Sequence, residues 1–220
     1  MQEVLQDVGT QTEKAYLIIK QKILEGIYKP SEKLIESHLA KELGVSRNTI
    51  KKAFLMLEKE KLIVLEENKG AKIKSFTLQE VNNYLEIRAA LEGVIIRSAV
   101  PKIANEDLHA LQEILDHMKS CIEGNHLDEY SKLNKEFHQT IYKAAQNEQA
   151  VELVSMIKTQ LIRYHFRTIL VPGRNQSSFE EHTAIFNALQ KRDADEAEAA
   201  IKRHILNIRK TINDYYHFLV

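Results

Sequence analysis

The stretch LGVSRNTIKKAF, from Leu43 to Phe54, decides the fold of the first third of the chain. A glycine turn leads into Ser46, whose hydroxyl can cap a helix by accepting a hydrogen bond from the first turn. Ile50, Phe54 and Leu57 then recur at helical spacing and form one apolar face. The hydroxyl, amide and cationic side chains at the start of this helix are either ordinary capping with a solvated face, or a surface for an anionic partner.

Two helices precede this stretch and a hairpin follows it. An apolar stripe runs from Tyr16 to Leu24, and the segment LIESHLAKEL forms a short second helix that ends at Gly44. After the third helix, two β-prone runs flank residues 67–70, a turn-forming cluster. Three helices, a short glycine turn and a hairpin in this order predict a winged helix-turn-helix, which favours the DNA-binding interpretation.

The polar start of the third helix has the chemistry of a recognition helix. Such a helix enters the major groove with its N-terminal residues first, where Arg can bind guanine and Asn can bind adenine through two hydrogen bonds. Hydroxyl groups and the helix N-terminus favour phosphate, and a basic hairpin tip can reach the minor groove or a phosphate. The predicted DNA-binding residues are Ser46, Arg47, Asn48, Thr49, Lys51, Lys69 and Gly70.

Composition excludes several classes of protein. Lys and Arg together number 31, as do Asp and Glu, although residues 1–75 hold 14 basic and 11 acidic side chains against 17 and 20 in residues 76–220. A single cysteine, Cys121, excludes an internal disulfide and a cysteine-based zinc site. No signal peptide and no apolar run of membrane-spanning length is visible, so we expect a cytoplasmic protein without a membrane partner.

The pattern changes near Thr77, beyond which the chain looks entirely helical. We expect a DNA-binding domain over residues 1–75, with residues 1–12 flexible, and a separate helical domain over residues 76–220. The predicted fold is mainly α: a winged helix-turn-helix of three helices plus a β-hairpin, followed by an antiparallel six-helix bundle. Its six helices cover about 77–100, 105–123, 127–146, 148–170, 178–191 and 194–218. Two of them begin with capping boxes, Ser178 with Glu181 and Asp193 with Glu196.

Four residues of the helical part could hold a metal ion. Asn134 and His138 share one helical face at i and i+4, His182 lies in the first turn or two of its helix, and His204 lies in mid-helix. Three imidazoles and one side-chain oxygen from three helices suit zinc, nickel, copper or iron. The chain has nine histidines, so the residues alone leave open that these are surface or hydrogen-bonded core histidines.

Residues 14–75 resemble the DNA-binding domain of the GntR family of bacterial transcription regulators. The family pattern is Gly-x-x-x-Pro-Gly-x-x-Leu, then Leu-Ala-x-x-Leu-Gly-Val-Ser-Arg, then a wing ending Arg-Gly. The chain departs from it at Ser31, usually Gly, at Thr49, often Pro, and at Ser37, where relatives carry a basic residue. Lys51 and Lys69 stand where the family has Arg, and Lys cannot make the bidentate hydrogen bonds of Arg. The family's operator sequence therefore cannot be carried over to this chain. The matching residues are Gly26, Pro30, Leu34, Leu39, Ala40, Leu43, Gly44, Val45, Ser46, Arg47, Leu57, Leu62 and Gly70.

Residues 78–218 resemble the FCD ligand-binding domain of the FadR subfamily, on the segments IRAALEG, NKEFHQTIYKAAQN and EEHTAIFNALQKRDADEAEAAIKRHI. The resemblance implies a divalent transition metal, zinc or nickel, held by Asn134, His138, His182 and His204. It also implies that residues 76–220 dimerise and bind an effector, a small carboxylate, near that metal. Arg88 would pair with the carboxylate, Tyr84 would line the pocket, and Glu92 would support the structure.

The function expected from both resemblances is a transcription regulator, a repressor, that binds a near-palindromic double-stranded operator as a homodimer. A regulator that responds to acyl-CoA or another organic ligand without a metal is one alternative, and a His-ligated metalloenzyme is a second. The chain shows no separate acid or base, nucleophile motif or glycine-rich phosphate loop, so we expect that it is not an enzyme.

Overall fold

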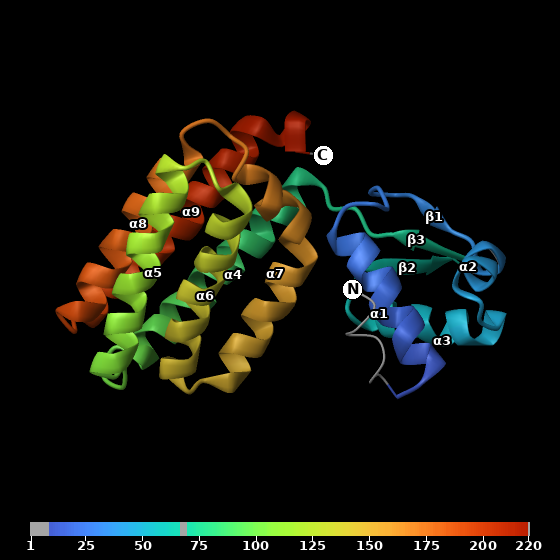
Figure 1. Cartoon of the computed structure of the whole chain (residues 1–220), viewed down its shortest axis with the longest axis horizontal. Helices are drawn as coiled ribbons and strands as arrows, with labels where there is room; N and C mark the ends of the chain where they lie inside the picture. Colours follow the sequence, from blue (N-terminus) through green and yellow to red (C-terminus); the bar gives the residue numbers. More distant parts are fainter. Residues whose placement is uncertain (1–8, 67–69, 220) are drawn as a thin grey trace. The chain divides into compact units, whose positions relative to one another are not determined.

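The computed structural model of the chain describes residues 9–66 and 70–219, and the chain divides into two compact units, Met1–Thr77 and Leu78–Val220 (Figure 1). The fold is mainly helical and has the winged helix-turn-helix and the helical bundle that the sequence predicts. The first unit consists of α1 (Gln11–Leu24), β1 (Lys33–Leu34), α2 (Glu36–Leu43), α3 (Arg47–Lys59), β2 (Ile63–Glu66) and β3 (Gly70–Ile73).

The turn between α2 and α3 is built as the sequence predicts. Gly44 ends α2 with a left-handed φ of 65°, and the side-chain oxygen of Ser46 accepts a hydrogen bond from the backbone N–H of Thr49 at 3.1 Å. The apolar face of α3, including Ile50 and Phe54, is buried against α1. This packing fixes the direction in which the polar first turn of α3 points.

The first helix begins at Gln11, inside the segment 1–12 that the sequence analysis expects to be flexible. Thr10 and Glu13 form a capping box, in which each side chain accepts a hydrogen bond from the other's backbone N–H, so α1 begins at Gln11. Residues 1–8, the rest of that segment, lie outside the described residues.

The hairpin of the wing is part of a three-stranded antiparallel sheet with strand order β1-β3-β2. The hairpin prediction is confirmed, with Val64 opposite Lys72, but β1 was not predicted. The turn before β1 places Ser31 at a φ of 64°, in the left-handed region that glycine prefers. Gly70 has a φ of 86°, and a Cβ there would lie 2.8 Å from the backbone oxygen of Leu34 in β1. The sheet therefore requires glycine where the wing meets β1.

The second unit is a bundle of antiparallel helices. In one pair, the first and the last helix of the unit, Asn82 near the start of the first bonds Asn213 near the end of the last. At the other end of the same pair, Arg97 bonds Glu198. One predicted boundary is wrong: the fifth helix of this unit begins at Arg174, after the left-handed Gly173, so Ser178 lies inside it and does not cap it. The helices are α4 (Leu78–Ala99), α5 (Asn105–Glu123), α6 (Leu127–Ala145), α7 (Glu148–Thr168), α8 (Arg174–Gln190) and α9 (Ala194–Leu219).

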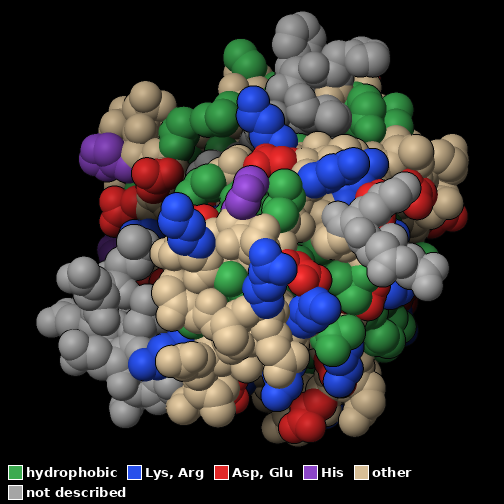
Figure 2. All heavy atoms as spheres, turned by 90° about the vertical axis from the view of Figure 1, so that its right-hand side faces the viewer, with side chains coloured by type: hydrophobic (Ala, Val, Ile, Leu, Met, Phe, Trp, Pro, Cys, Tyr) green, Lys and Arg blue, Asp and Glu red, His purple; other side chains and the backbone are tan. Residues whose placement is uncertain are grey.

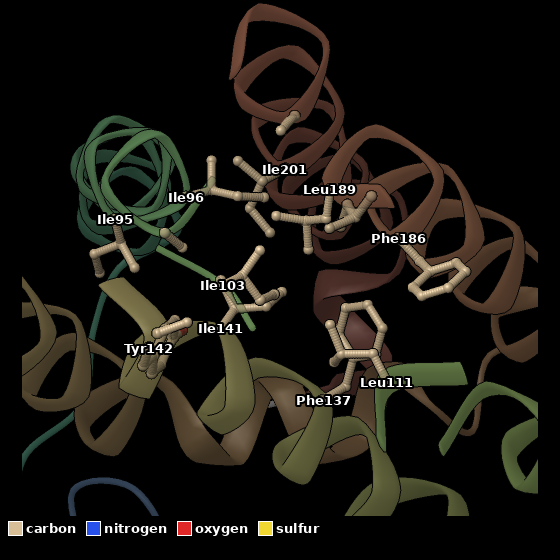
Figure 3. Packing of buried hydrophobic residues seen from close by; sticks show 14 of the residues in the cluster. Ile95, Ile96, Ile103, Leu111, Phe137, Ile141, Tyr142, Phe186, Leu189 and Ile201 are labelled. Carbon is tan, nitrogen blue, oxygen red and sulfur yellow. The ribbon is translucent and has the colours of Figure 1, made fainter. Parts of the chain in front are cut away.

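The core of the bundle joins side chains from helices distant in sequence. Figure 3 shows Ile96 of α4, Ile141 of α6, Leu189 of α8 and Ile201 of α9 pointing toward one another around Ile103. This apolar layer holds the facing surfaces of α6, α8 and α9 in fixed register. In the described ranges, none of the helices combines the length and the apolar character that crossing a membrane demands.

Candidate metal centre and nucleic-acid interface

Three buried histidines meet inside the bundle, each from a different helix. His138 of α6, His182 of α8 and His204 of α9 are 2%, 0% and 1% exposed. Their ring centroids lie 5.2 Å (His138 to His182), 5.4 Å (His138 to His204) and 4.6 Å (His182 to His204) apart. One ring nitrogen from each lies within 4.8 Å of the other two. The structure thus brings together the three histidines that the sequence singles out, although His182 lies in the third turn of α8, later than predicted, because α8 begins at Arg174.

The spacing of the ring nitrogens fits a metal ion. The Nε2 atoms of His138 and His182 are 3.3 Å apart. Two nitrogens bound to one tetrahedral zinc ion at about 2.0–2.1 Å lie roughly 3.3 Å apart. In the described part of the chain the buried Nε2 of His204 makes no hydrogen bond. A buried polar atom without a partner is rare, and a metal ion would supply one here.

Hydrogen bonds to the other ring nitrogens fix two of these imidazoles in the orientation a metal needs. His182 Nδ1 lies 2.5 Å from the backbone carbonyl of Ser178, which can only accept, so Nδ1 carries the proton and Nε2 keeps its lone pair. His204 Nδ1 likewise donates to the carboxylate of Glu181 at 2.6 Å. Carboxylates and carbonyls commonly support metal-binding histidines in this way.

The carboxylate of Glu181 is saturated with donors. Besides His204, it accepts hydrogen bonds from two guanidinium nitrogens of Arg174, at 3.3 and 2.8 Å, and from Asn207 at 2.8 Å. The charge of Arg174 balances that of Glu181, so the α8–α9 side of the histidine cluster is electrically neutral. Sequence reasoning missed Glu181 as a supporting residue because it read this glutamate as part of a helix cap, although its position directly before His182 was a usable signal.

On the opposite side, His138 faces a second buried carboxylate. Its Nδ1 lies 3.8 Å from Glu92 Oε2, too far for a hydrogen bond but close enough for a small ring movement to make one. Glu92 Oε1 accepts from Arg88 Nε at 2.9 Å and from the hydroxyl of Tyr142 at 2.8 Å. Arg88 is therefore buried in an ion pair with Glu92.

Burial keeps all three imidazoles neutral. It lowers the pKa of His182 to about 3, with the neighbouring His204 as the next contribution. Burial also lowers the pKa of His138 and His204 well below the ordinary value, helped by the charges of Lys158 and Arg174 respectively. The neutral imidazole is the form that binds metals.

The two other residues predicted for this site are Asn134 and Tyr84. Asn134 lies one turn before His138 on α6 and its Oδ1 is buried, and Tyr84 is half-buried one turn before Arg88 on α4. Their contact with a metal or an effector stays a prediction.

The predicted DNA-binding residues lie at the exposed start of α3. Ser46, Arg47 and Asn48 are exposed, whereas Thr49 is half-buried and its hydroxyl is 2.9 Å from that of Ser46. Lys51 is exposed one turn further along α3, with its Nζ 3.9 Å from a carboxylate oxygen of Glu36. The cluster therefore combines capping hydroxyls with cations that reach into solvent.

A groove of about 730 Å³ runs beside this surface. Arg47 and Lys51 of α3, Ser37 of α2 and Gly70 at the start of β3 all line it, so the recognition helix and the wing border one concavity. Lys69, the predicted wing cation, lies outside the described residues. Figure 2 shows Lys and Arg side chains interspersed with acidic side chains among the described residues of one face of the molecule.

Comparisons with known proteins agree with the two-domain organisation of the chain. Residues 11–73 match the model of the gntR family of bacterial regulatory proteins, and residues 83–207 match the FCD domain. The HTH-type transcriptional repressor RspR of Escherichia coli is 26% identical over 200 residues, covering 91% of this chain and 88% of that protein. The Uxu operon regulator of Haemophilus influenzae is 30% identical over 213 residues, covering 87% and 78%.

A solved structure supports the fold. E. coli McbR/YncC superposes with a TM-score of 0.75 at 20% identity, covering 94% of this chain and all (100%) of that one. The family models, the regulators among the relatives and the winged helix-turn-helix with its helical bundle agree on a regulator and not an enzyme. The chain belongs to the GntR family of DNA-binding transcription regulators, in the FadR-type subfamily that carries an FCD domain.

Proposed function

We propose that this regulator is a cytoplasmic homodimeric repressor whose operator affinity depends on a metal ion and a small carboxylate effector. In this proposal residues 1–75 bind DNA, and residues 76–220 bind the effector and dimerise. The observation that carries the metal-dependent part is the convergence of three neutral, buried imidazoles from α6, α8 and α9, with their outer nitrogens supported by Ser178 and Glu181.

His138, His182 and His204 would bind a divalent metal, zinc or nickel, with Asn134 as a fourth ligand. Three imidazoles and one amide oxygen match the preferences of these ions. An ion bound there would supply positive charge deep in the bundle, which a carboxylate could approach. Arg88, with Tyr84 one turn before it, would then help to attract and orient a carboxylate effector.

The DNA-binding role rests on the exposed first turn of α3 and the groove that it shares with the wing. Arg47 and Asn48 would contact base edges, while Ser46, Thr49, Lys51 and the wing residues Lys69 and Gly70 would contact or adjoin the phosphates. One winged helix reads few base pairs, so two copies would bind a near-palindromic operator. RspR is named a repressor, which supports repression as the mode of action here.

Metal removal tests the proposal directly. The purified protein is dialysed against EDTA, and its melting temperature is compared before and after zinc or nickel is returned, alongside elemental analysis. A ligand at a hundredfold excess over its Kd stabilises the folded state by about 2.7 kcal/mol, which corresponds to roughly 5–10 °C for a chain of this size.

Substitution locates the site. His138→Ala, His182→Ala and His204→Ala should each abolish the response to metal, whereas His117→Ala, an exposed histidine of α5, should leave it intact. Identical melting of the wild-type protein with chelator and with metal, together with no bound metal, would leave the histidines as core residues around an organic effector.

A further inference from the structure

The surroundings of the histidine cluster differ in charge on its two sides. On the α8–α9 side, Glu181 is matched by Arg174 and has four donors. On the α4–α6–α7 side, Glu92 is the partner of Arg88, but a second cation, Lys158 of α7, lies beside the same group of residues. With the three imidazoles neutral, this second side carries an excess positive charge.

Lys158 is held in place without a carboxylate. Its Nζ lies 3.5 Å from the hydroxyl of Tyr142 and 5.2 Å from the centroid of that ring. In the part of the chain that the structure describes, no carboxylate forms an ion pair with Lys158. Burial and the charge of Arg88 lower its pKa to about 8, so the ammonium group is held where its charge is unfavourable.

Tyr142 connects this cation to the histidine cluster. It lies one turn after His138 on α6, with the two ring centroids 6.1 Å apart, and its hydroxyl donates to Glu92. The ammonium group and the imidazole of His138 thus both lie close to the ring of Tyr142. An incompletely paired, partly buried cation is unfavourable in the free protein and becomes favourable when an anion arrives.

We propose that Lys158 binds a second anionic group of the effector, so that the effector is a short dicarboxylate with one carboxylate at the histidine cluster and the other at Lys158 and Tyr142. This inference rests on the proposed carboxylate effector and specifies that the effector is a dicarboxylate. On the α8–α9 side Arg174 is already paired with Glu181, so the second carboxylate lies toward α4 and α7. Lys158 therefore distinguishes dicarboxylates from monocarboxylates.

The test measures binding to the full-length, metal-loaded protein by calorimetry and by the shift in melting temperature. The probes are malonate, succinate and glutarate, with butyrate as the four-carbon monocarboxylate and inorganic phosphate as a different anion. One dicarboxylate should bind about ten- to a hundredfold tighter than butyrate, as expected for a charge-assisted hydrogen bond. Lys158→Met should remove that preference without weakening butyrate, and Lys158→Arg should retain most of it.

Lys119→Met, which removes an exposed cation from α5, is the matched control and should keep the preference. Lys158→Met should fold as well as the wild type, because it removes a cation that has no carboxylate partner. Equal binding of dicarboxylates and butyrate, an unchanged preference in Lys158→Met, or a Lys158-dependent preference for phosphate alone would overturn the inference. If no carboxylate binds at all, the inference also falls, and the response to EDTA then shows separately whether the metal site stands.

Discussion

Glu181 and His204 are joined by a 2.6 Å contact between a carboxylate oxygen and Nδ1, and Glu181 is the residue directly before His182. One turn of α8 therefore both contributes an imidazole to the cluster and orients the imidazole that α9 contributes. A change at Glu181 should disturb the site without removing any of its three histidines.

Glu181→Gln should lower metal affinity by about 10–100-fold, the usual effect of losing a carboxylate that supports a metal-binding histidine. The neutral amide cannot hold the His204 N–H as strongly, and it leaves Arg174 without its counter-charge. Competition with a metal-binding dye measures the change. Glu180→Gln, the exposed neighbour on α8, should keep wild-type affinity, and equal affinity in both variants would contradict a supporting role for Glu181.

The metal-free protein should lose stability as the pH falls from 6.5 toward 3. The pKa of His182 is about 3 in the folded state against 6.5 when unperturbed, so in this window the unfolded chain binds a proton that the folded chain excludes. The free energy of unfolding then falls by about 1.4 kcal/mol per pH unit for such a group, and His138 and His204 act in the same direction. Urea unfolding in EDTA at pH 7.5 and pH 5 measures it. His182→Gln should flatten the dependence, whereas His117→Gln should not.

Arg47→Ala should reduce the preference for the operator over random DNA, with little effect on the affinity for random DNA. A bidentate contact to guanine contributes about 1–3 kcal/mol of discrimination, so specific affinity should fall by about ten- to a hundredfold while affinity for random DNA changes little. Lys69→Ala should instead weaken all sequences alike and reduce the salt dependence. Fluorescence anisotropy at several salt concentrations separates the two effects, and an intact preference in Arg47→Ala would contradict the recognition-helix assignment.

Ser31→Gly should stabilise the first unit by about 0.5–1 kcal/mol. Ser31 has a φ of 64°, which is strained for any residue with a Cβ, and this relief outweighs the extra freedom of glycine in the unfolded chain. The substitution also removes the exposed contact of its hydroxyl with Ser75, 3.0 Å away. Ser75→Ala removes the same contact without touching the backbone, so it separates the two effects in a urea titration. A loss of stability in Ser31→Gly would show that the hydroxyl matters more than the strain.

The sequence predicted the elements whose signals are local. Gly44 and Ser46 mark the turn before α3 because a left-handed C-cap and a hydroxyl N-cap are both decided by a few neighbouring residues. β1 was missed because two residues carry no periodicity, and its partner β3 lies far along the chain. The start of α8 was misplaced because Ser178 and Glu181 have the spacing of a capping box, yet both face the interior of the bundle.

The same distinction applies to the histidine cluster. The three histidines could be chosen from motif resemblance and helical spacing, but their convergence depends on how α6, α8 and α9 pack. Glu181 contacts His204 of α9, and Lys158 of α7 contacts Tyr142 of α6, so both act through contacts across helices, which no periodicity within one helix reveals. Arg174 acts through Glu181. Sequence reasoning therefore found the candidate ligands and missed the groups that orient them.

The close approach of Gly70 to the Leu34 carbonyl has a consequence for how this regulator can diverge. Every amino-acid substitution at position 70 adds a Cβ at a backbone conformation that disfavours one. Substitutions at this point of the wing should therefore be selected against. Arg47 and Asn48 are exposed and hold no core together, so they can be exchanged freely. New operator preferences in descendants of this protein should therefore arise by replacement on α3, while the glycine of the wing is inherited unchanged.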